Sequence, residues 1–313
     1  MSNQSTANLL MIRPVSFGYN EQTADSNAFQ TRSSDQQQVQ KKALAEFDGL
    51  VQALRDNHVN VTVIEDTLHP HTPDSIFPNN WVSFHNNGDV FIYPMQAENR
   101  RQERREDIIT KLEDNFIVKH VFDLSHFEHN KQFLEGTGSM VLDRDNKIVY
   151  ACISPRTNEN VLAQFCEQTG YKAICFHAFD EKGLAIYHTN VLMCVGSNFS
   201  VICLDSITNT TEKELVIKSL KDTNKQIIEI SYDQMNRFAG NMLEVKNTQG
   251  ETLIVMSQSA YQSLMYEQKA VLSSFGKLIY ADINTIEING GGSARCMIAE
   301  VHLPIKNLRQ TND

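Results

Sequence analysis

The sequence has little of several features that would place it quickly in a class of protein. Its 313 residues contain one tryptophan, seven prolines and six cysteines, and no two cysteines have the C-x-x-C spacing. This absence disfavours a zinc site or a dithiol redox centre. No segment approaches the roughly 20 apolar residues of a membrane-spanning helix, and the apolar run after the polar residues 1–6 is too short for a signal peptide. We therefore expect a cytoplasmic protein without a membrane partner.

Basic side chains are also scarce. The sequence has 28 lysines and arginines against 38 aspartates and glutamates, which gives a net charge of −10. This balance argues against nucleic acid as a partner, because nonspecific binding to nucleic acid needs a basic surface. The one dense basic run, residues 100–105, is interleaved with and followed by acids, which predicts the solvated face of a helix.

Most of the cysteines lie inside apolar stretches, which predicts that they are core residues in a reducing compartment. These five are Cys152, Cys166, Cys175, Cys194 and Cys203. Cys296 is different, because three glycines, 290–292, precede it and an apolar segment follows it. Glycines add backbone entropy that folding must remove, so a run of them suits a tight turn close to a ligand. A thiol after such a turn is suited to be a nucleophile, although a free cysteine is as often a small buried hydrophobic residue.

Four segments of the chain share one layout. Each has two apolar strands joined by a turn of the Asn/Gly kind, which predicts a β-hairpin, and an amphipathic helix and a further apolar strand follow. The hairpins begin at residues 80, 138, 190 and 241, so the intervals between them are 58, 52 and 51 residues. The helices are expected at 104–112, 158–169, 211–220 and 261–275. Units of about fifty residues with their own hairpin favour blades around an axis over a stacked rod.

A fifth unit is divided between the two ends of the sequence. Residues 9–13 predict a strand, 34–57 an amphipathic helix and 59–64 another strand. The strand that this unit lacks is the last one, 296–301. Its return to the first unit would close a ring and remove exposed sheet edges. We therefore predict one α/β-propeller domain over residues 1–313, with five blades and a first blade that the C-terminal strand closes.

Closure of the ring would place the starts of the inner strands around one axis, where several polar residues lie. These residues are Asn80, Glu135, His188, Asn190 and Cys296. A thiol, an imidazole and a carboxylate are together the parts of an activated nucleophile. They are far apart in the sequence, but the repeat is expected to bring them together.

On these residues the chain resembles the superfamily of guanidino-group-modifying enzymes. Its members are five-bladed α/β-propellers of the pentein fold and include arginine deiminase, dimethylarginine dimethylaminohydrolase and glycine amidinotransferase. The resemblance depends on four motifs: Glu-Gly-x-Gly from Glu135, the run 154–158, His188, and Gly-Gly-x-x-x-Cys ending at Cys296. Within the superfamily, the segment 12–20 is most similar to the branch that hydrolyses citrulline.

The resemblance implies a role for each matching residue. Cys296 corresponds to the nucleophile, and His188 corresponds to the acid and base. Glu135 corresponds to the carboxylate that hydrogen-bonds the terminal nitrogens of the substrate. Arg100 and Arg156 correspond to arginines that hold the α-carboxylate of the substrate, a task that suits their two-pronged donor geometry. For both arginines, a plain ion pair is the alternative.

Three further residues are expected at the substrate. Phe77 lies in the run before the second hairpin, and the backbone amides of Gly291 and Gly292 could stabilise a developing oxyanion. The resemblance implies a small amino-acid substrate and no metal or organic cofactor. Two histidines and two aspartates within residues 66–74 give only a weak hypothesis of a metal site.

Two departures from the arginine-consuming relatives decide the expected substrate. Where those relatives have aspartates that grip a guanidinium group, this sequence has Asn80 and Asn190. A carboxylate only accepts hydrogen bonds, whereas an amide accepts and donates and can therefore serve a neutral ureido group. With these changes, the resemblance implies hydrolysis of citrulline to ornithine, ammonia and carbon dioxide. The alternative is that both asparagines are ordinary turn residues, like Asn241.

Two other functions stay open. The same fold could act on arginine, methylated arginine or another guanidine as a deiminase, dimethylaminohydrolase or amidinotransferase. It could also be a noncatalytic binding propeller, which the acidic charge and the complete set of Cys, His and Glu disfavour. The sequence likewise leaves open whether the protein forms a homodimer and whether residues 17–29 form a loop that closes over the substrate.

Overall fold

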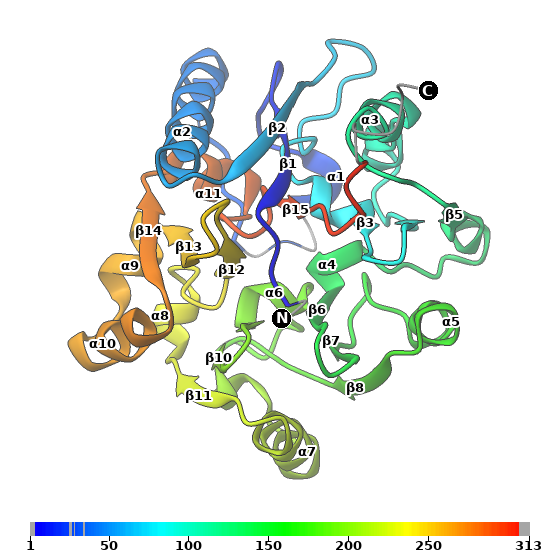
Figure 1. Ribbon diagram of the computed structural model, residues 1–313. Helices are drawn as coiled ribbons and strands as arrows, with labels where there is room; N and C mark the ends of the chain where they lie inside the picture. Colours follow the sequence, from blue (N-terminus) through cyan, green and yellow to red (C-terminus); the bar gives the residue numbers. More distant parts are fainter. Residues whose placement is uncertain (1–3, 25–26, 28, 34, 307–313) are drawn as a thin grey trace.

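The computed structural model describes residues 4–24, 27, 29–33 and 35–306. Within them, the strands form five three-stranded sheets arranged around one axis (Figure 1). The sheets are β15 (Ala299–Glu300), β1 (Asn8–Arg13) and β2 (Asn60–Glu65); β3 (Val82–Phe84), β4 (Asp89–Ile92) and β5 (His120–Asp123); β6 (Met140–Asp143), β7 (Ile148–Cys152) and β8 (Lys172–Phe176); β9 (Met193–Val195), β10 (Phe199–Ile202) and β11 (Gln226–Glu229); and β12 (Leu243–Lys246), β13 (Thr252–Ser257) and β14 (Lys277–Ala281).

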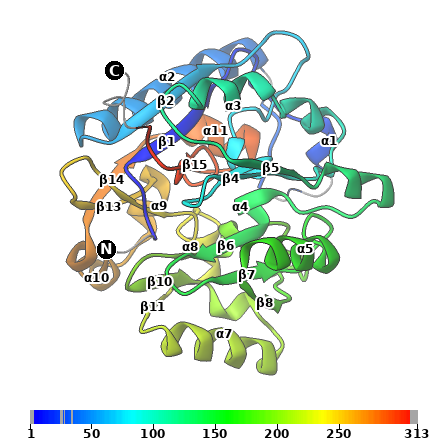
Figure 2. The same ribbon diagram turned by 45° about the vertical axis from the view of Figure 1, so that its right-hand side comes forward.

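Helices connect the strands of each sheet. The longer ones are α2 (Gln36–Asp56), α3 (Glu106–Leu112), α5 (Glu159–Thr169), α7 (Thr210–Asp222), α10 (Tyr266–Phe275) and α11 (Asn284–Gly290). The shorter helices and 3-10 turns are α1 (Glu21–Ala24), η1 (Pro78–Asn80), η2 (Asn99–Glu103), η3 (Ser125–Asn130), α4 (Gly136–Ser139), α6 (Thr189–Leu192), η4 (Leu204–Ser206), α8 (Tyr232–Met235) and α9 (Gln258–Ser263). Figures 1 and 2 place α2, α3, α5, α7 and α10 at the periphery of the ring.

One pairing pattern recurs in all five sheets. The inner strand pairs antiparallel with the middle strand, and the middle strand pairs parallel with the outer one. The antiparallel pair needs only a short turn, whereas the parallel pair needs a crossover that a helix can supply. In the first sheet the inner strand is β15, in which Ala299 and Glu300 pair with Leu10 and Leu9 of β1. The predicted five-bladed ring, closed by the C-terminal strand, is confirmed.

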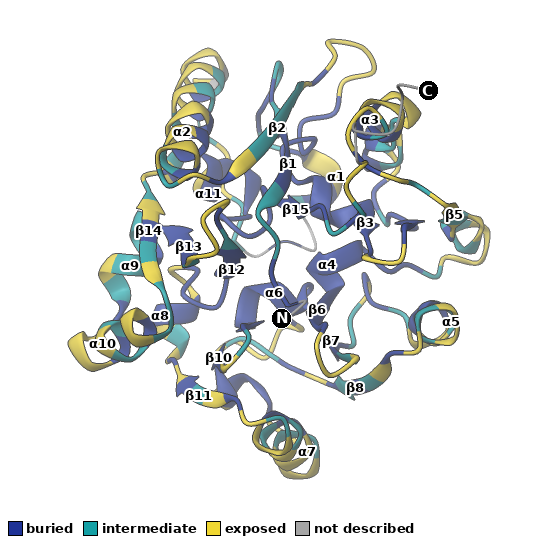
Figure 3. Cartoon of the chain, viewed as in Figure 1, coloured by how far each residue is buried: buried dark blue, intermediate teal, exposed yellow. Residues whose placement is uncertain are grey.

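The peripheral helices form because one face of each is apolar, as α2 illustrates. Its first turn is capped by Asp35, whose Oδ1 accepts a hydrogen bond from the backbone N–H of Gln38 at 3.1 Å. Every third or fourth residue of the helix then turns toward the sheets and is buried: Val39, Ala43, Phe47, Leu50 and Leu54. Full burial of one Leu or Phe side chain stabilises the fold by about 1.5–3 kcal/mol. Figure 3 shows the result, with exposed residues on the outer helix faces and buried residues around the axis.

The inner strands begin later than the sequence predicted. Asn80 lies in η1, Gly138 in α4 and Asn190 in α6, so that a helical turn precedes the strand in three of the repeats. The predicted strand 296–301 is likewise reduced to β15, and Cys296 lies in the turn before it. Because α4 packs against both η1 and α6, these turns gather polar side chains at one end of the ring.

Three smaller predictions need correction. The expected helix 261–275 is two helices, α9 and α10. The basic run 100–105 does not form a solvated helix face, because Arg100 and Glu103 are only 2% and 3% exposed and form an ion pair. Of the five cysteines expected in the core, two are only half-buried, Cys166 and Cys175. Within the described ranges, no helix is both long and apolar enough to cross a membrane.

Candidate active site

The predicted site residues converge on one cavity at the end of the ring where the helical turns lie. Eight of them line it: Phe77, Asn80, Arg100, Arg156, His188, Gly291, Gly292 and Cys296. Asn190 contacts the sulfur of Cys296, and Glu135 lies behind His188 and is bonded to it. Four residues that the sequence analysis did not assign to the site complete the lining: Asn27, Asp74, Tyr187 and Gly290.

The glycine run forms the turn that presents Cys296. Helix α11 ends at Gly290, and Gly291 adopts a left-handed conformation with φ of +64°, which favours glycine. A Cβ at Gly291 would lie 2.5 Å from the side-chain amide of Asn27, and one at Gly292 would lie 2.9 Å from the ring of Phe77. Side chains at these positions would therefore displace the cavity wall.

Two amides point at the sulfur. Nδ2 of Asn241 lies 3.3 Å from Sγ of Cys296, and Nδ2 of Asn190 lies 3.5 Å from it. Asn241 is itself held in place, because its Oδ1 accepts a hydrogen bond from the backbone N–H of Arg295. Burial raises the pKa of the Cys296 thiol, although these hydrogen bonds act in the opposite direction. In the absence of substrate, the cysteine is therefore favoured as the neutral thiol.

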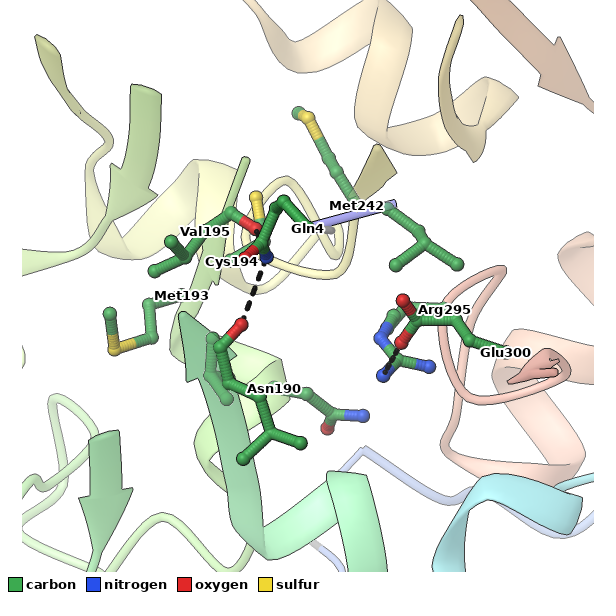
Figure 4. A pocket seen from close by; sticks show the side chains of 11 residues that line it. Gln4, Asn190, Met193, Cys194, Val195, Met242, Arg295 and Glu300 are labelled. Carbon is green, nitrogen blue, oxygen red and sulfur yellow. Dashed lines mark hydrogen bonds and ion pairs between the residues drawn. The ribbon is translucent and has the colours of Figure 1, made fainter. Parts of the chain in front are cut away.

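Asn241 was missed as a site residue. It was taken as an ordinary turn residue, yet it begins the fifth repeat just as Asn80 and Asn190 begin theirs. That shared position was the signal that could have found it. Asn190 also borders a second cavity on the axis, which Figure 4 shows together with Gln4 and the ion pair between Arg295 and Glu300.

His188 and Glu135 form a buried pair, and His188 lines the same cavity as Cys296. Nε2 of His188 lies 2.8 Å from Oε2 of Glu135. Burial lowers the pKa of His188 to about 4, against the opposing pull of the Glu135 carboxylate. Burial alone would raise the pKa of Glu135, but Arg156, His188 and Arg100 together hold it well below its usual range. The imidazole is therefore neutral at rest, next to a carboxylate that would stabilise its protonated form.

The second glycine of the Glu-Gly-x-Gly motif, Gly138, packs closely against His188. A Cβ at Gly138 would lie 2.8 Å from Nδ1 of His188 and 2.5 Å from Nδ2 of Asn80. A Cβ carbon does not approach another heavy atom this closely, so any larger residue would push the histidine away. The motif is explained by close packing of α4 against the imidazole.

Arg100 is held by protein groups on each of its nitrogens. Nε and Nη2 bond the two carboxylate oxygens of Glu103 at 2.8 and 2.9 Å, and Nη1 donates to Oδ1 of Asn80 at 2.9 Å. The amide of Asn80 is occupied at its other end too, because Nδ2 donates to Oδ1 of Asn79. Arg100 and Asn80 thus border the cavity while they hold each other in place.

Arg156 bridges the Glu135–His188 pair and the N-terminal segment. Its Nη1 lies 3.4 Å from Oε2 of Glu135, and its Nη2 donates to the backbone oxygen of Thr23 at 3.3 Å. The guanidinium also stacks on Tyr187, with Cζ 4.8 Å from the ring centroid. This arrangement links the acid behind His188 to the residues that cover the cavity.

Asp74 is the second residue that sequence reasoning missed. Its Oδ2 accepts a hydrogen bond from Asn20 at 2.7 Å, whereas its buried Oδ1 has no hydrogen-bond partner. Burial raises the pKa of Asp74. The sequence analysis placed it only in the weak metal hypothesis for residues 66–74. Among the described residues no group of three or more His, Cys, Asp or Glu could hold a metal ion.

The segment 17–29, for which the sequence left a closing role open, lies only partly within the described residues, because 25, 26 and 28 are outside them. Of the described part, Asn27 lines the cavity and donates to the backbone oxygen of Gly290 at 3.2 Å. Thr23 contacts Arg156, and Asn20 contacts Asp74. The segment therefore covers the cavity; its movement stays a prediction.

The expected oxyanion donors are only partly suited to that task. The backbone N–H of Gly291 donates to the carbonyl of Glu287 at 2.9 Å, as the last bond of helix α11. The backbone N–H of Cys296, which was not among the expected donors, bonds the carbonyl of Ser293. The side-chain amides of Asn190 and Asn241, by contrast, point at the sulfur.

The family follows from comparison with known proteins. A profile of the family described as N,N dimethylarginine dimethylhydrolase, eukaryotic, matches residues 13–303. The chain belongs to that family. With its fold, this places it in the pentein superfamily of guanidino-modifying enzymes. No curated protein matches this chain significantly.

Solved structures with the same fold include ArgZ and DDAH. One is the N-terminal domain of ArgZ, an arginine dihydrolase from cyanobacteria, solved as a cysteine-to-serine mutant bound to substrate. It matches with a TM-score of 0.74 and 16% identity, over 96% of this chain and 99% of that one. The chain spans only 41% of full-length ArgZ, with a TM-score of 0.74 and 16% identity over 96% of its own length. DDAH from Pseudomonas aeruginosa, a cysteine-to-serine mutant complexed with citrulline, matches with a TM-score of 0.67 and 17% identity over 95% of this chain and 99% of that one.

Proposed function

We propose that this protein hydrolyses a C–N bond of a ureido amino acid, namely citrulline, and releases ornithine, ammonia and carbon dioxide. The observation that carries the proposal is the pair of neutral amides, Asn190 and Asn241, that donate toward the sulfur of Cys296. An amide both donates and accepts hydrogen bonds, so it complements the N–H groups and the carbonyl of a ureido group.

The charges near the sulfur favour the same substrate. The carboxylate of Glu135 is engaged by His188, by Arg156 and by the backbone N–H of Gln96. A guanidinium at the sulfur would therefore have no carboxylate of its own, and a buried charge without a partner costs several kcal/mol. A neutral ureido group avoids this cost. The engagement of Glu135 also supports a different role from the one the resemblance implied: it orients His188 instead of binding substrate nitrogens.

The far wall of the cavity has charges suited to the amino-acid end of citrulline. The unpartnered Oδ1 of Asp74 would accept a hydrogen bond from the α-ammonium group. Arg156 is the better candidate for the α-carboxylate, because Arg100 is already held by Glu103 and Asn80. A zwitterionic head group would thus be bound at one end of the cavity and a neutral ureido group at the other.

The proposed chemistry begins from the neutral pair. Because the pKa of Cys296 is raised and that of His188 is lowered to about 4, the thiolate forms when the thiol proton moves to His188 as substrate binds. Glu135 stabilises the resulting imidazolium. The thiolate attacks the ureido carbon, and the imidazolium protonates the δ-nitrogen as ornithine leaves.

The second half of the reaction releases the carbamoyl group. Ornithine leaves an S-carbamoyl group on Cys296, and neutral His188 takes a proton from the water that attacks it. The carbon–sulfur bond breaks, the proton returns to the sulfur, and the carbamate decomposes to ammonia and carbon dioxide. Overall, citrulline and one water give ornithine, ammonia and carbon dioxide.

A second candidate is hydrolysis of a guanidino substrate such as arginine or a methylated arginine. Asp74 favours this second candidate. It adds a buried carboxylate with an unpartnered oxygen to a cavity for which the sequence predicted only the carboxylate of Glu135. The candidate is weaker because Asp74 lies against Arg100 and Asn20, and not against the sulfur.

Incubation of the purified protein with citrulline, arginine and dimethylarginine in parallel tests these candidates. Amino-acid analysis and ammonia release should show ornithine from citrulline at a rate well above the other two, and none with the Cys296→Ser variant. Turnover of arginine without citrulline would favour the second candidate. If no substrate turns over, the third possibility, a noncatalytic propeller, would be favoured.

A further inference from the structure

A further polar cavity, separate from the active site and from the cavity on the axis, lies between the hairpin turns of two neighbouring sheets. It is lined by His85, Asn86, Arg144, Lys147, Tyr171 and His302, and we call it the hairpin cavity. Strand β6 connects it with the active site, because Gly138 before the strand packs on His188 and Arg144 follows its last residue. A strand of four residues spans about 13 Å, so the two sites are separate.

The hairpin cavity holds its cations close together. Arg144 is 8% exposed, and the exposed Lys147 lies beside it. Burial lowers the pKa of Lys147, and the neighbouring charge of Arg144 lowers it further, while Asp89 acts in the opposite direction. Two like charges in one partly buried site repel each other, and an anion between them would remove that cost.

The carboxylates around the hairpin cavity are committed elsewhere. Glu300 accepts from Arg295 at 2.9 Å and from His302 at 3.2 Å, and lies 3.8 Å from Arg144. Asp143 pairs with the ammonium of Lys225, and Asp89 is bonded by Asn87 and His120. Arg144 therefore shares the carboxylate of Glu300 with two other groups. Lys147 makes a long bond to the carbonyl of Thr169, at 3.4 Å, and its Nζ lies 4.7 Å from the ring centroid of Tyr171.

The remaining lining groups would suit an anion as donors. His85 and His302 are almost fully buried, and burial and the charge of Arg144 lower the pKa of both, that of His302 to about 4. A neutral imidazole has one N–H, and His302 donates its own to Glu300. His85 can donate from Nδ1 if its Nε2 accepts the hydroxyl of Ser83. Tyr171 is buried and presents a phenol, and Asn86 presents an amide at the rim.

The geometry points to a binding site for a small oxyanion, of the carboxylate or phosphate class, held between Arg144 and Lys147 in the hairpin cavity. Arginine suits this ligand because its N–H groups match two oxygens at once, and lysine supplies a point charge. No other hairpin turn in the described ring has two cations: its counterparts are 86–88, 196–198 and 247–250.

The site is placed to influence the nucleophile. Arg144 lies against Glu300, Glu300 holds Arg295, and the backbone N–H of Arg295 donates to Asn241. Asn241 in turn donates to the sulfur of Cys296 at 3.3 Å. An anion that drew Arg144 away from Glu300 would tighten the bond between Glu300 and Arg295. Arg295 is bonded to Asn241, which contacts the sulfur of Cys296.

Isothermal titration of the full chain with inorganic phosphate, at ionic strength held constant with sodium chloride, tests the binding. Wild-type protein should bind one phosphate saturably, and Lys147→Gln should weaken the affinity by about tenfold or more, because a charge-assisted contact is lost. Lys147→Arg should keep the affinity. Lys172→Gln is the matched control, because Lys172 is an exposed lysine on the adjacent strand, outside the hairpin cavity.

Parallel titrations with acetate separate the two ligand classes: tighter binding of phosphate assigns the site to phosphoryl groups, and tighter binding of acetate assigns it to carboxylates. Unchanged phosphate affinity in Lys147→Gln would overturn the proposal, because the anion would then bind elsewhere, such as at Arg156 in the active site. Absence of saturable binding of either anion to wild-type protein would overturn it as well.

Discussion

The active site and the hairpin cavity lie at opposite ends of strand β6, and they balance their cations differently. At the active site, Arg100 has Glu103 as a full partner and Arg156 lies against Glu135. In the hairpin cavity, Arg144 has only a shared, distant carboxylate. An arginine that is paired with a carboxylate holds neighbouring groups in place, whereas an arginine without a close carboxylate can still bind an anionic ligand. Variants at the two sites test that contrast.

The largest effect is expected from removal of the sulfur. Cys296→Ser should lower ornithine formation from citrulline by about 10³-fold or more, because a serine hydroxyl is a far weaker nucleophile than a thiol that His188 can deprotonate. Phosphate binding at the other end of β6 should be unchanged. Cys175→Ser, which alters a half-buried cysteine away from the cavity, is the matched control. Substantial turnover by Cys296→Ser would show that another group attacks the substrate.

The two buried glutamates at the active site should separate stability from catalysis. Glu135→Gln and Glu103→Gln each leave a buried arginine short of its carboxylate, so both should destabilise the protein by about 3–5 kcal/mol in urea unfolding. Only Glu135→Gln should also lower kcat, by about 10²-fold or more, since only Glu135 stabilises the protonated form of His188. Equal losses of kcat in the two variants would remove the special role of Glu135.

A new charge at the sulfur should alter the choice of substrate. Asn190→Asp places a carboxylate within contact of Sγ, which disfavours the thiolate and removes a donor to the ureido oxygen. The kcat/KM for citrulline should fall by about tenfold or more, while the ratio of arginine to citrulline turnover rises. Asn198→Asp, on an exposed turn, should leave both values unchanged. A constant substrate ratio in Asn190→Asp would contradict the neutral-pocket argument.

The smallest effect concerns stability in mild acid. His188 at one end of the ring and His302 at the other each have a folded pKa of about 4, well below the value of about 6.5 in an unfolded chain. Between these values the unfolded chain binds more protons, so each histidine lowers the free energy of unfolding as the pH falls from 6.5 to 4. Glu287 and Glu103 act in the opposite direction, because burial raises the pKa of each to about 7.

A difference measurement isolates the contribution of one histidine. His302→Gln should lose stability at pH 7 but show a shallower decline toward pH 4.5 than the wild type, by at most about 1.4 kcal/mol per pH unit. Urea unfolding at several pH values measures this slope. Parallel pH curves for the two proteins would show that His302 is protonated to the same extent in the folded and unfolded states.

The repeat made the fold predictable, and the fold made much of the site predictable. Hairpins at regular intervals and a missing strand in the first unit were enough to place Glu135, His188 and Cys296 around one axis. Each of these residues stands next to a strand start, so its position followed from the pattern. The order of strands within each sheet followed as well, because a hairpin and a crossover permit little else.

What the sequence did not reveal depends on contacts between segments without periodicity. Asp74 lies in an irregular stretch, and only folding brings its unpartnered oxygen into the cavity. Arg100 belongs to a run that has the composition of a solvated helix, yet it is buried by pairing with Glu103, and composition alone does not encode that pairing. The helical turn at Asn190 was missed for a related reason, since four residues are too few to show a helical period.

The antiparallel pairing of β1 with β15 joins the first strand of the chain to the last. The backbone N–H of Val301 bonds the carbonyl of Asn8, and Cys296 lies three residues before β15. The position of its sulfur in the cavity therefore depends on the pairing of β15 with β1.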